Sequence, residues 1–272
     1  MKTNELSVKL NAIMEKWDFS GCISICKDSE VIYQGYHGYA DYEAGKLNNL
    51  ETRFLIASVT KQFTAACVMM LVEEGKINLQ HTLDNYLPEY TYASQITIRQ
   101  MLNMMSGIPD MINEVIVEEI EQDNTERTQK EQLIFEYQTQ SRCFSVSEVL
   151  ELVNNRGLNF EPGTLMNYSN TNYSFLGFIV ERLTGQSLGT FMEERIFGPL
   201  HMNETTCNPS MATSIGYARM DGKIVRLGYG NDMSGDGCIV TTATNWSLWL
   251  NAVLTKNAIL SKQNWEQILT MV

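Results

Sequence analysis

Apolar and polar residues follow two different periods along the chain, and these periods predict its secondary structure. Residues 22–26 and 31–36 are rich in residues that favour strands, and the polar stretch 27–30 separates them, which predicts a β-hairpin. Between residues 58 and 74 the apolar positions recur every three or four residues. This spacing predicts a helix, and Gly75 provides its stop signal.

The rest of the chain has mostly helical or irregular patterning. Residues 6–14 place apolar side chains on one helical face, and residues 76–200 alternate helical patterns with loops. After residue 210 the chain is rich in glycine, and helical patterns return at 241–254 and 261–272. Because few segments resemble strands, we expect a small or incomplete sheet. With 272 residues, of which 44% are hydrophobic, the chain can form one large domain or two interleaved ones.

The charge of the chain narrows its possible partners. The formal net charge is −12, and a chain this acidic repels phosphate backbones and anionic lipids, so we expect no nucleic-acid partner and no membrane partner. The N-terminal segment lacks the continuous apolar core of a signal peptide, and no stretch is long and apolar enough to span a bilayer. We therefore expect a cytoplasmic protein, or a secreted or periplasmic one if a leader has been removed.

Cysteine and histidine offer little support for a metal site. None of the six cysteines forms a Cys-x-x-Cys pair, and the chain has only three histidines. This usage disfavours both a zinc site and a disulfide framework. We expect no metal and no organic cofactor.

Ser58 and Lys61 form the first candidate pair for chemistry. A serine hydroxyl becomes a good nucleophile when a neighbouring base takes its proton, and residues i and i+3 of a helix share one face. A lysine acts as that base only when burial or nearby charge favours its neutral form. From the residues alone, the alternative is a serine near a helix start with a solvated lysine. A second Ser-x-x-Lys match, Ser24 to Lys27, lies on a predicted strand, where the two side chains face opposite sides.

Tyr168 and Asn170 form a second candidate pair. A tyrosine beside a serine–lysine pair can relay a proton to a leaving group, and an asparagine side chain can bind a substrate amide. The alternatives are a core tyrosine and a turn-forming asparagine. A second Tyr-x-Asn match, at residues 229–231, lies in a glycine-rich stretch, where we expect it only to shape a loop.

Several segments, taken in order, resemble those of the serine β-lactamase and penicillin-binding protein family, in the branch of class C β-lactamases, D-Ala-D-Ala carboxypeptidases and related esterases. They are residues 54–90, 96–110, 160–185, 195–206 and 235–250, so the resemblance covers nearly the whole chain. It implies an α+β fold, in which an α/β sandwich with an antiparallel sheet adjoins an all-helical domain.

The resemblance also implies a division of the chain and roles for the candidate residues. Residues 1–75 and 205–272 would form the α/β part, and residues 76–204 the helical domain. Ser58 would be the acylated nucleophile, with its backbone N–H in the oxyanion hole, and Lys61 its proton acceptor. Tyr168 would be a second general acid/base, and Asn170 would contact the substrate amide. The implied reaction is acyl-enzyme hydrolysis of a small-molecule or short-peptide substrate, such as a β-lactam, a D-Ala-D-Ala peptide or a small ester.

The chain departs from the family pattern in two places. The family often carries a histidine before a Ser-Gly pair, whereas residues 104–107 are Met-Met-Ser-Gly. The family's third motif, Lys-Thr-Gly or His-x-Gly on a strand, is not found in this sequence. We therefore expect an incomplete sheet, in a fragment or in a chain whose sheet a partner chain or dimer completes. The alternative function is a non-catalytic penicillin- or peptide-binding domain, or an inactive fragment.

Overall fold

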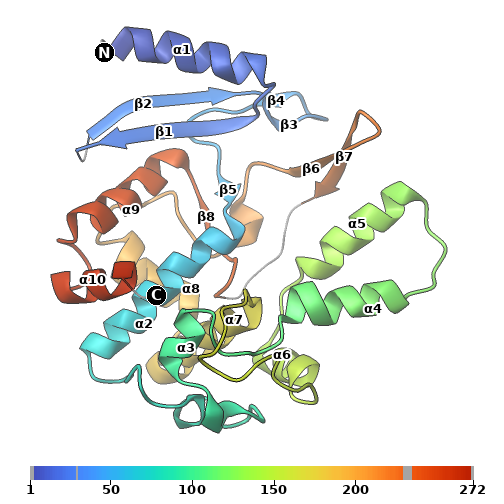
Figure 1. Cartoon of the computed structure of the whole chain (residues 1–272). Helices are drawn as coiled ribbons and strands as arrows, with labels where there is room; N and C mark the ends of the chain where they lie inside the picture. Colours follow the sequence, from blue (N-terminus) through green and yellow to red (C-terminus); the bar gives the residue numbers. More distant parts are fainter. Residues whose placement is uncertain (1–2, 29, 229–234, 271–272) are drawn as a thin grey trace.

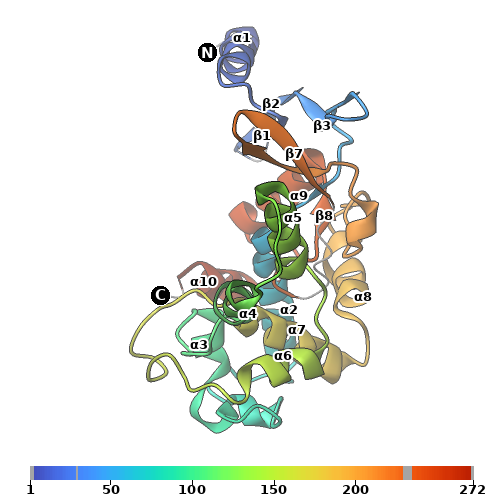
Figure 2. The ribbon, with the colours of Figure 1, turned by 90° about the vertical axis from the view of Figure 1, so that its right-hand side faces the viewer.

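A computed structural model describes residues 3–28, 30–228 and 235–270 of the chain. The fold combines helices with short antiparallel strand pairs, most of which lie in the upper half of the view in Figure 1, so the expected α+β class is confirmed. In Figure 2, helix α1 lies at one end of the molecule, and α3 and α6 lie near the other end. The division into an α/β part and a helical domain stays a prediction.

The predicted N-terminal hairpin is confirmed. Strands β1 (Gly21–Lys27) and β2 (Glu30–His37) pair antiparallel, with Ser24 opposite Gln34. Helix α1 (Thr3–Lys16) packs on one face of this hairpin and α9 (Ala243–Thr255) on the other (Figure 1). The Tyr33 hydroxyl donates to Asn11 Oδ1 of α1 at 2.8 Å, whereas Ser24 Oγ lies 2.7 Å from Ser247 Oγ of α9. Alternate residues of the hairpin therefore bind the two helices.

The predicted helix after residue 58 is also confirmed, with a tighter first turn. Residues Ala57–Thr60 form a 3₁₀ turn, and α2 follows at Lys61–Glu73. Most of α2 is buried on all sides, as its nearly continuous apolar sequence requires. Gly75 ends the helix in the left-handed region at φ 70°, where glycine has no steric penalty.

Helices dominate the middle of the chain, as the sequence predicts. Helix α7 packs against α2, and these two helices form the centre of the molecule. Two π-helical segments, Met111–Ile116 and Glu193–Phe197, continue into or from neighbouring helices. The α-helices of this part are α3 (Ile98–Leu102), α4 (Val117–Gln122), α5 (Gln129–Gln140), α6 (Val146–Val153), α7 (Asn170–Thr184) and α8 (Leu188–Met192).

One element after residue 210 is missing from the sequence-based prediction. Strands β6 (Gly216–Met220) and β7 (Lys223–Gly228) form a second antiparallel hairpin where we expected an irregular, glycine-rich stretch. Its turn is Asp221-Gly222, and both residues have positive φ, at 51° and 74°. Asp-Gly at this position is a strong hairpin signal, so the sequence does contain the information. The two helices predicted near the C-terminus are confirmed as α9 and α10 (Lys262–Thr270).

The strands described here pair only in twos. The remaining pairs are β3 (Tyr39–Asp41) with β4 (Lys46–Leu47), and β5 (Phe54–Leu55) with β8 (Val240–Thr241). Within the described ranges, the expected small sheet is therefore four separate two-stranded sheets. Completion of the sheet by a partner chain or dimer stays a prediction.

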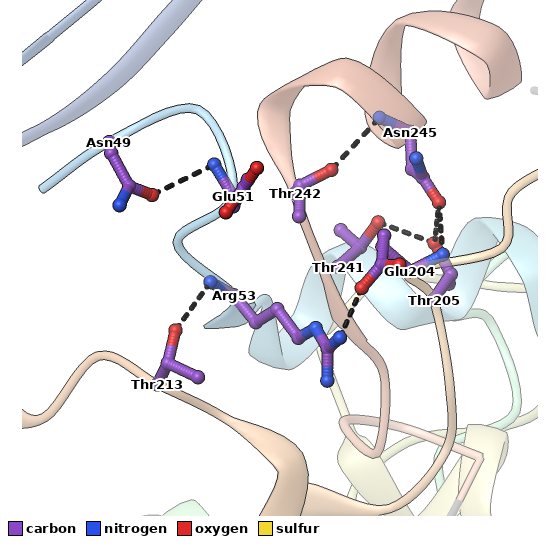
Figure 3. Close-up of polar contacts among 9 residues, drawn as sticks. All are labelled: Asn49, Glu51, Arg53, Glu204, Thr205, Thr213, Thr241, Thr242 and Asn245. Atoms are coloured by element: carbon purple, nitrogen blue, oxygen red, sulfur yellow. Dashed lines mark hydrogen bonds and ion pairs between the residues drawn. The ribbon is translucent and has the colours of Figure 1, made fainter.

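A polar cluster holds the β5–β8 pair in place (Figure 3). The Arg53 guanidinium donates to the Glu204 carboxylate, and the Arg53 backbone N–H donates to Thr213 Oγ1 at 2.9 Å. Thr205 Oγ1 lies 2.7 Å from Thr241 Oγ1 and donates to Asn245 Oδ1 at 3.1 Å. These contacts connect the residue before β5 with β8 and with the first turn of α9.

Candidate active site

The structure brings the four sequence-predicted residues together from two distant segments. The Ser58 hydroxyl lies 2.6 Å from the Tyr168 hydroxyl, and Lys61 Nζ donates to Ser58 Oγ at 3.0 Å. Lys61 Nζ also donates to Asn170 Oδ1 at 2.8 Å, and the Tyr168 hydroxyl donates to the same oxygen at 3.2 Å. The result is a closed ring of hydrogen bonds around one serine hydroxyl.

The β5–β8 pair determines where Ser58 lies. The Ile56 backbone N–H donates to the Ile239 carbonyl at 2.9 Å, and the Ile239 N–H donates to Thr60 Oγ1 at 3.1 Å. Between these anchors, Ala57 adopts φ 45°, which is uncommon for a residue with a Cβ. Ser58 then lies in the 3₁₀ turn, in which residues i and i+3 eclipse each other, so its side chain meets Lys61.

The Lys61 amine is buried and donates hydrogen bonds to three acceptors. Its side chain is 7% exposed, and its third hydrogen bond goes to the Asp236 carbonyl at 3.0 Å. The amine also lies 5.0 Å from the centre of the Tyr168 ring. Among the described residues, Lys61 takes part in no ion pair.

Asn170 connects Lys61 to a buried carboxylate that the sequence analysis missed. Its side-chain Nδ2 donates to both oxygens of Asp110, at 3.2 and 3.1 Å. Asp110 is 1% exposed and also accepts from the backbone N–H groups of Ile112 and Asn113, at the start of the first π-helical segment. The Asp110 contacts fix the orientation of the Asn170 amide, so that its oxygen faces Lys61. A contact between Asn170 and a substrate stays a prediction.

A glycine brings the Asp236 carbonyl within reach of Lys61. A Cβ on Gly235 would lie 2.5 Å from the Tyr173 carbonyl, so only glycine fits against α7 at this point. The Gly235 carbonyl accepts from Thr64 Oγ1 of α2 at 2.6 Å, and Ser174 Oγ of α7 donates to the Asp236 carboxylate at 2.8 Å. Helices α2 and α7 therefore both bind residues 235–236, and the Asp236 carbonyl is the third acceptor of the Lys61 amine.

Tyr168 and Ser58 are the exposed members of this hydrogen-bonded cluster, whereas Lys61 and Asn170 are buried. The Tyr168 side chain is 44% exposed, although its hydroxyl contacts both Ser58 and Asn170. The neighbouring Tyr173 is buried, and this burial, with a smaller effect of Tyr168, raises the pKa of Tyr173 to about 12. Tyr173 therefore stays neutral and donates to the Leu102 carbonyl at 3.0 Å.

The second Ser-x-x-Lys match lies away from this site, and the second Tyr-x-Asn match cannot be placed. Ser24 and Lys27 lie on β1, where Ser24 bonds to α9, as the strand prediction requires. The second Tyr-x-Asn match, residues 229–231, lies outside the described residues. Met104, within the Met-Met-Ser-Gly sequence, accepts a 3.7 Å contact from Asn172 Nδ2 through its sulfur.

Two supporting residues, Asp110 and Asp236, were absent from the sequence-based prediction. Asp110 had a local signal, because aspartate commonly caps the first turn of a helix. Asp236 contributes a backbone carbonyl, which no side-chain motif can reveal. Across the three described ranges, no three His, Cys, Asp or Glu side chains gather as a metal site would require, and no helix has the length and apolar character needed to cross a membrane.

Comparisons with known proteins identify the family of the chain. The Beta-lactamase family model matches residues 11–270. Penicillin-binding protein 4* of Bacillus subtilis (strain 168) is 28% identical over 206 residues, which cover 75% of this chain and 41% of that protein. The chain thus spans less than half the length of this relative.

Solved structures extend the likeness to the fold. The penicillin-binding protein from Bacillus halodurans superposes with a TM-score of 0.77 at 26% identity, covering 96% of this chain and 78% of that chain. D-amino acid amidase from Ochrobactrum anthropi SV3, complexed with L-phenylalanine amide, superposes with a TM-score of 0.72 at 25% identity. The superposition covers 90% of this chain and 67% of that chain. From the family match over nearly its whole length, we conclude that the chain belongs to the Beta-lactamase family of serine hydrolases.

Proposed function

We propose that this chain is a β-lactamase-related serine hydrolase that acts through an acyl-enzyme on Ser58. The observation that carries the proposal is the environment of the Ser58 hydroxyl. A buried amine lies 3.0 Å from its oxygen, and a tyrosine hydroxyl lies 2.6 Å away on the solvent side. A serine needs such a base to become a nucleophile, and a leaving group needs such a donor.

The acylation step follows from these contacts. Ser58 Oγ forms a bond to the substrate carbonyl carbon while its proton passes to a neutral Lys61 amine. The Ser58 backbone N–H stabilises the oxyanion that develops. The bond to the leaving nitrogen or oxygen then breaks, and Tyr168 donates a proton to it. Lys61 then returns the proton that it took from Ser58 to the Tyr168 phenolate, so that the amine and the phenol regain their starting protonation.

Deacylation returns the site to its starting state. A water molecule attacks the ester carbonyl of the acyl-enzyme, and its proton passes to the Tyr168–Lys61 pair. The bond between Ser58 Oγ and the carbonyl carbon breaks, and Ser58 recovers its proton. Asn170 and Asp110 keep the Lys61 amine aligned throughout both steps.

The substrate class that we propose is a β-lactam, a D-Ala-D-Ala-type peptide or a small ester or amide. Support comes from the similar proteins, which include penicillin-binding proteins and a D-amino acid amidase. A chain of net charge −12 disfavours strongly anionic substrates.

The alternative is a penicillin- or peptide-binding domain that is acylated without turnover, or an inactive fragment. The observation that favours it is the lack of Lys-Thr-Gly or His-x-Gly in the sequence, since the strand with that motif supplies a second oxyanion donor in the family. Loss of one such donor costs about 100- to 1,000-fold in rate in other enzymes.

Intact-protein mass spectrometry with a small methyl-substituted fluorophosphonate tests the nucleophile. We expect a single adduct on the wild-type chain and on Ser24→Ala, the serine of the duplicate motif. The adduct should be absent from Ser58→Ala. An adduct that persists in Ser58→Ala, or no adduct on a folded wild-type chain, contradicts the proposal. Turnover of nitrocefin and p-nitrophenyl esters then separates the hydrolase from the alternative, which would give one acyl group per chain.

A further inference from the structure

A cavity of about 490 Å³ lies between strands β3 and β5, the β6–β7 hairpin and helix α5. Its volume falls within the range of about 300–1,000 Å³ that is usual for small-molecule pockets. The described residues that line it do not include Ser58, Lys61, Tyr168 or Asn170. The cavity is therefore a space of its own, and the proposed acylation chemistry gives it no role.

One buried acceptor in the lining of this cavity has no hydrogen-bond donor. Asn48 is 2% exposed, and its Oδ1 atom has no partner among the described residues. Its Nδ2 donates to the His37 carbonyl at 2.8 Å and to Ser20 Oγ at 3.3 Å. A reversed amide would place Oδ1 against the His37 carbonyl, so these contacts fix its orientation. Buried carbonyl oxygens nearly always have a donor, and a ligand in the cavity can supply the one that Asn48 lacks.

A second unpaired polar group comes from a different element. Tyr137 of α5 lines the cavity, and in the described part of the chain its hydroxyl has no hydrogen-bond partner. Burial raises the pKa of Tyr137, so its phenol stays neutral and can both donate and accept. Because Asn48 directly follows β4 whereas Tyr137 lies on α5, a ligand needs more than one polar group to contact both.

The charges of the lining are neutralised within the protein. Asp18 and Arg219, the charged residues among the described lining residues, form an ion pair with each other. A charged ligand would lose its hydration without gaining an unpaired counter-charge among these residues. The cavity therefore favours an uncharged ligand.

Tyrosine rings supply the apolar surface of the cavity. The Tyr42 ring centre lies 5.0 Å from that of Tyr39 and 5.2 Å, edge to face, from that of Tyr217. The Tyr217 hydroxyl donates to Asp41 Oδ1 at 2.8 Å and accepts from the Tyr42 backbone N–H at 3.1 Å, so the fold holds the rings in place. The negative face of an aromatic ring attracts positively polarised hydrogens, such as the C–H groups of a saturated ring that carries hydroxyls.

We propose that this cavity binds a neutral saccharide and that this site is separate from the Ser58 centre. The C–H groups of the sugar ring pack against the tyrosine rings. One sugar hydroxyl donates to Asn48 Oδ1, and another pairs with the Tyr137 hydroxyl. A ring of the same size without these hydroxyls would leave both protein groups unpaired, and a ring with a carboxylate would bring an unbalanced charge.

Titration followed by ligand-observed NMR tests the class of ligand. The probes are the methyl glycosides of glucose, galactose and mannose. Tetrahydropyran-2-methanol has the same ring with a single hydroxyl, and methyl glucuronide is the charged analogue. We expect at least one glycoside to bind at least about tenfold more tightly than both comparison compounds. If no glycoside shows this preference, the proposal is overturned, and Asn48 Oδ1 pairs with an ordered water only.

Variants of the lining tyrosines test where the glycoside binds. Tyr137→Phe removes one hydroxyl and should weaken binding about fivefold, whereas Tyr92→Phe, outside the cavity, should have no effect. Tyr39→Ala removes one ring and should weaken binding about tenfold. Tyr36→Ala is its matched control, because that exposed ring lies outside the cavity. Unchanged affinity in Tyr137→Phe or in Tyr39→Ala overturns the proposed site.

Asn48→Ala tests the buried acceptor. The variant should lose the preference for the glycoside over tetrahydropyran-2-methanol, and a folded variant that keeps this preference contradicts the proposal. The substitution also removes the donors to His37 and Ser20, so circular dichroism checks its fold. If it does not fold, Tyr137→Phe decides.

Modification of Ser58 tests whether the two sites are separate, because Ala57 lines the cavity and directly precedes Ser58. Ser58→Ala, and wild-type chain that carries the methyl phosphonate adduct, should bind the glycoside with unchanged affinity. A loss of affinity in the adduct would overturn the separate site. Glycoside binding by a chain that forms no adduct would remove the proposed hydrolase function alone.

Discussion

The active-site region joins two parts of the molecule that are built in different ways. Around Lys61, helices α2 and α7 and the segment 235–241 form one buried unit in which side chains and carbonyls satisfy one another. We call it the helical unit. Around this unit lie the hairpins β1–β2 and β6–β7. In the described structure, each of their strands pairs with one other strand only. The base Lys61 thus depends on helix packing, the nucleophile Ser58 depends on the β5–β8 pair, and the two hairpins shape what surrounds them.

The largest expected effect is a difference in the rate of Ser58 acylation between variants of the two Ser-x-x-Lys lysines. Lys61→Met keeps the apolar stem but removes the proposed base, so the rate of Ser58 acylation should fall about 100- to 10,000-fold. Lys27→Met, at the exposed last residue of β1, should leave the rate unchanged. The measurement is the time course of fluorophosphonate adduct formation. Equal losses in the two variants would mean that the helical unit has no special role.

Packing under the nucleophile gives the next largest effect. Phe63 is fully buried and stacks on Trp249 with ring centres 4.0 Å apart. Phe63→Ala should lower the free energy of unfolding by about 3–5 kcal/mol, because it leaves a cavity beneath α2. Val225 is the buried residue of hairpin strand β7, and Val225→Ala, which removes about two methylene equivalents, should cost about 1.6 kcal/mol.

Urea unfolding of both variants measures this difference between the two parts. The loss in Phe63→Ala should accompany a loss of acylation, since α2 carries Lys61. The Val225→Ala variant should retain its acylation rate. A larger loss of stability in Val225→Ala would contradict the comparison, because the hairpins would then be the more firmly packed part.

Local patterns predicted the elements of both parts better than they predicted the contacts between them. The β1–β2 hairpin and the helix after Ser58 follow from periods of two and about three and a half residues, which neighbours in the chain determine. The meeting of Ser58 with Tyr168 came from family resemblance, since 110 residues separate them. The Asp236 carbonyl could not be predicted, because its position depends on how closely Gly235 approaches α7. The β6–β7 hairpin was missed although Asp221-Gly222 signals it.

The Asp110 carboxylate, which contacts Asn170 of the helical unit, should matter for both the stability of the fold and the rate of acylation. Asp110→Asn places an amide where Asn170 and two backbone N–H groups donate, so at least one buried donor loses its acceptor. We expect a loss of about 1–3 kcal/mol in unfolding free energy and a slower acylation, because Asn170 can then turn its oxygen away from Lys61. Asp84→Asn, an exposed carboxylate of a surface turn, is the control.

Chemical denaturation and adduct kinetics on the same samples check this prediction. If Asp110→Asn loses stability but keeps the wild-type acylation rate, Asp110 supports the fold without positioning Lys61. The pair of readouts therefore distinguishes a structural role from a positioning one.

The smallest effect is expected in the hairpin part, at Asp41. Hydrogen bonds from the Ala44 backbone and from Tyr217, with the nearby Arg226 charge, hold the pKa of Asp41 below its ordinary value of 3.8. A carboxyl with a lowered folded-state pKa stabilises the protein above its unfolded pKa, and this contribution is lost as the pH falls through the folded pKa. Asp41→Asn should therefore lower Tm slightly at pH 7, and the difference from wild type should shrink as the pH falls below 3.8.

Thermal unfolding of the wild type and Asp41→Asn at pH 7, 4 and 3 measures this difference. The Ser58 adduct should form at the wild-type rate in this variant, because Asp41 contacts Tyr217 and none of the four active-site residues. A Tm difference that grows on acidification would reverse the sign of the argument. A loss of adduct formation would show that the hairpin part, and not only the helical unit, holds the nucleophile in place.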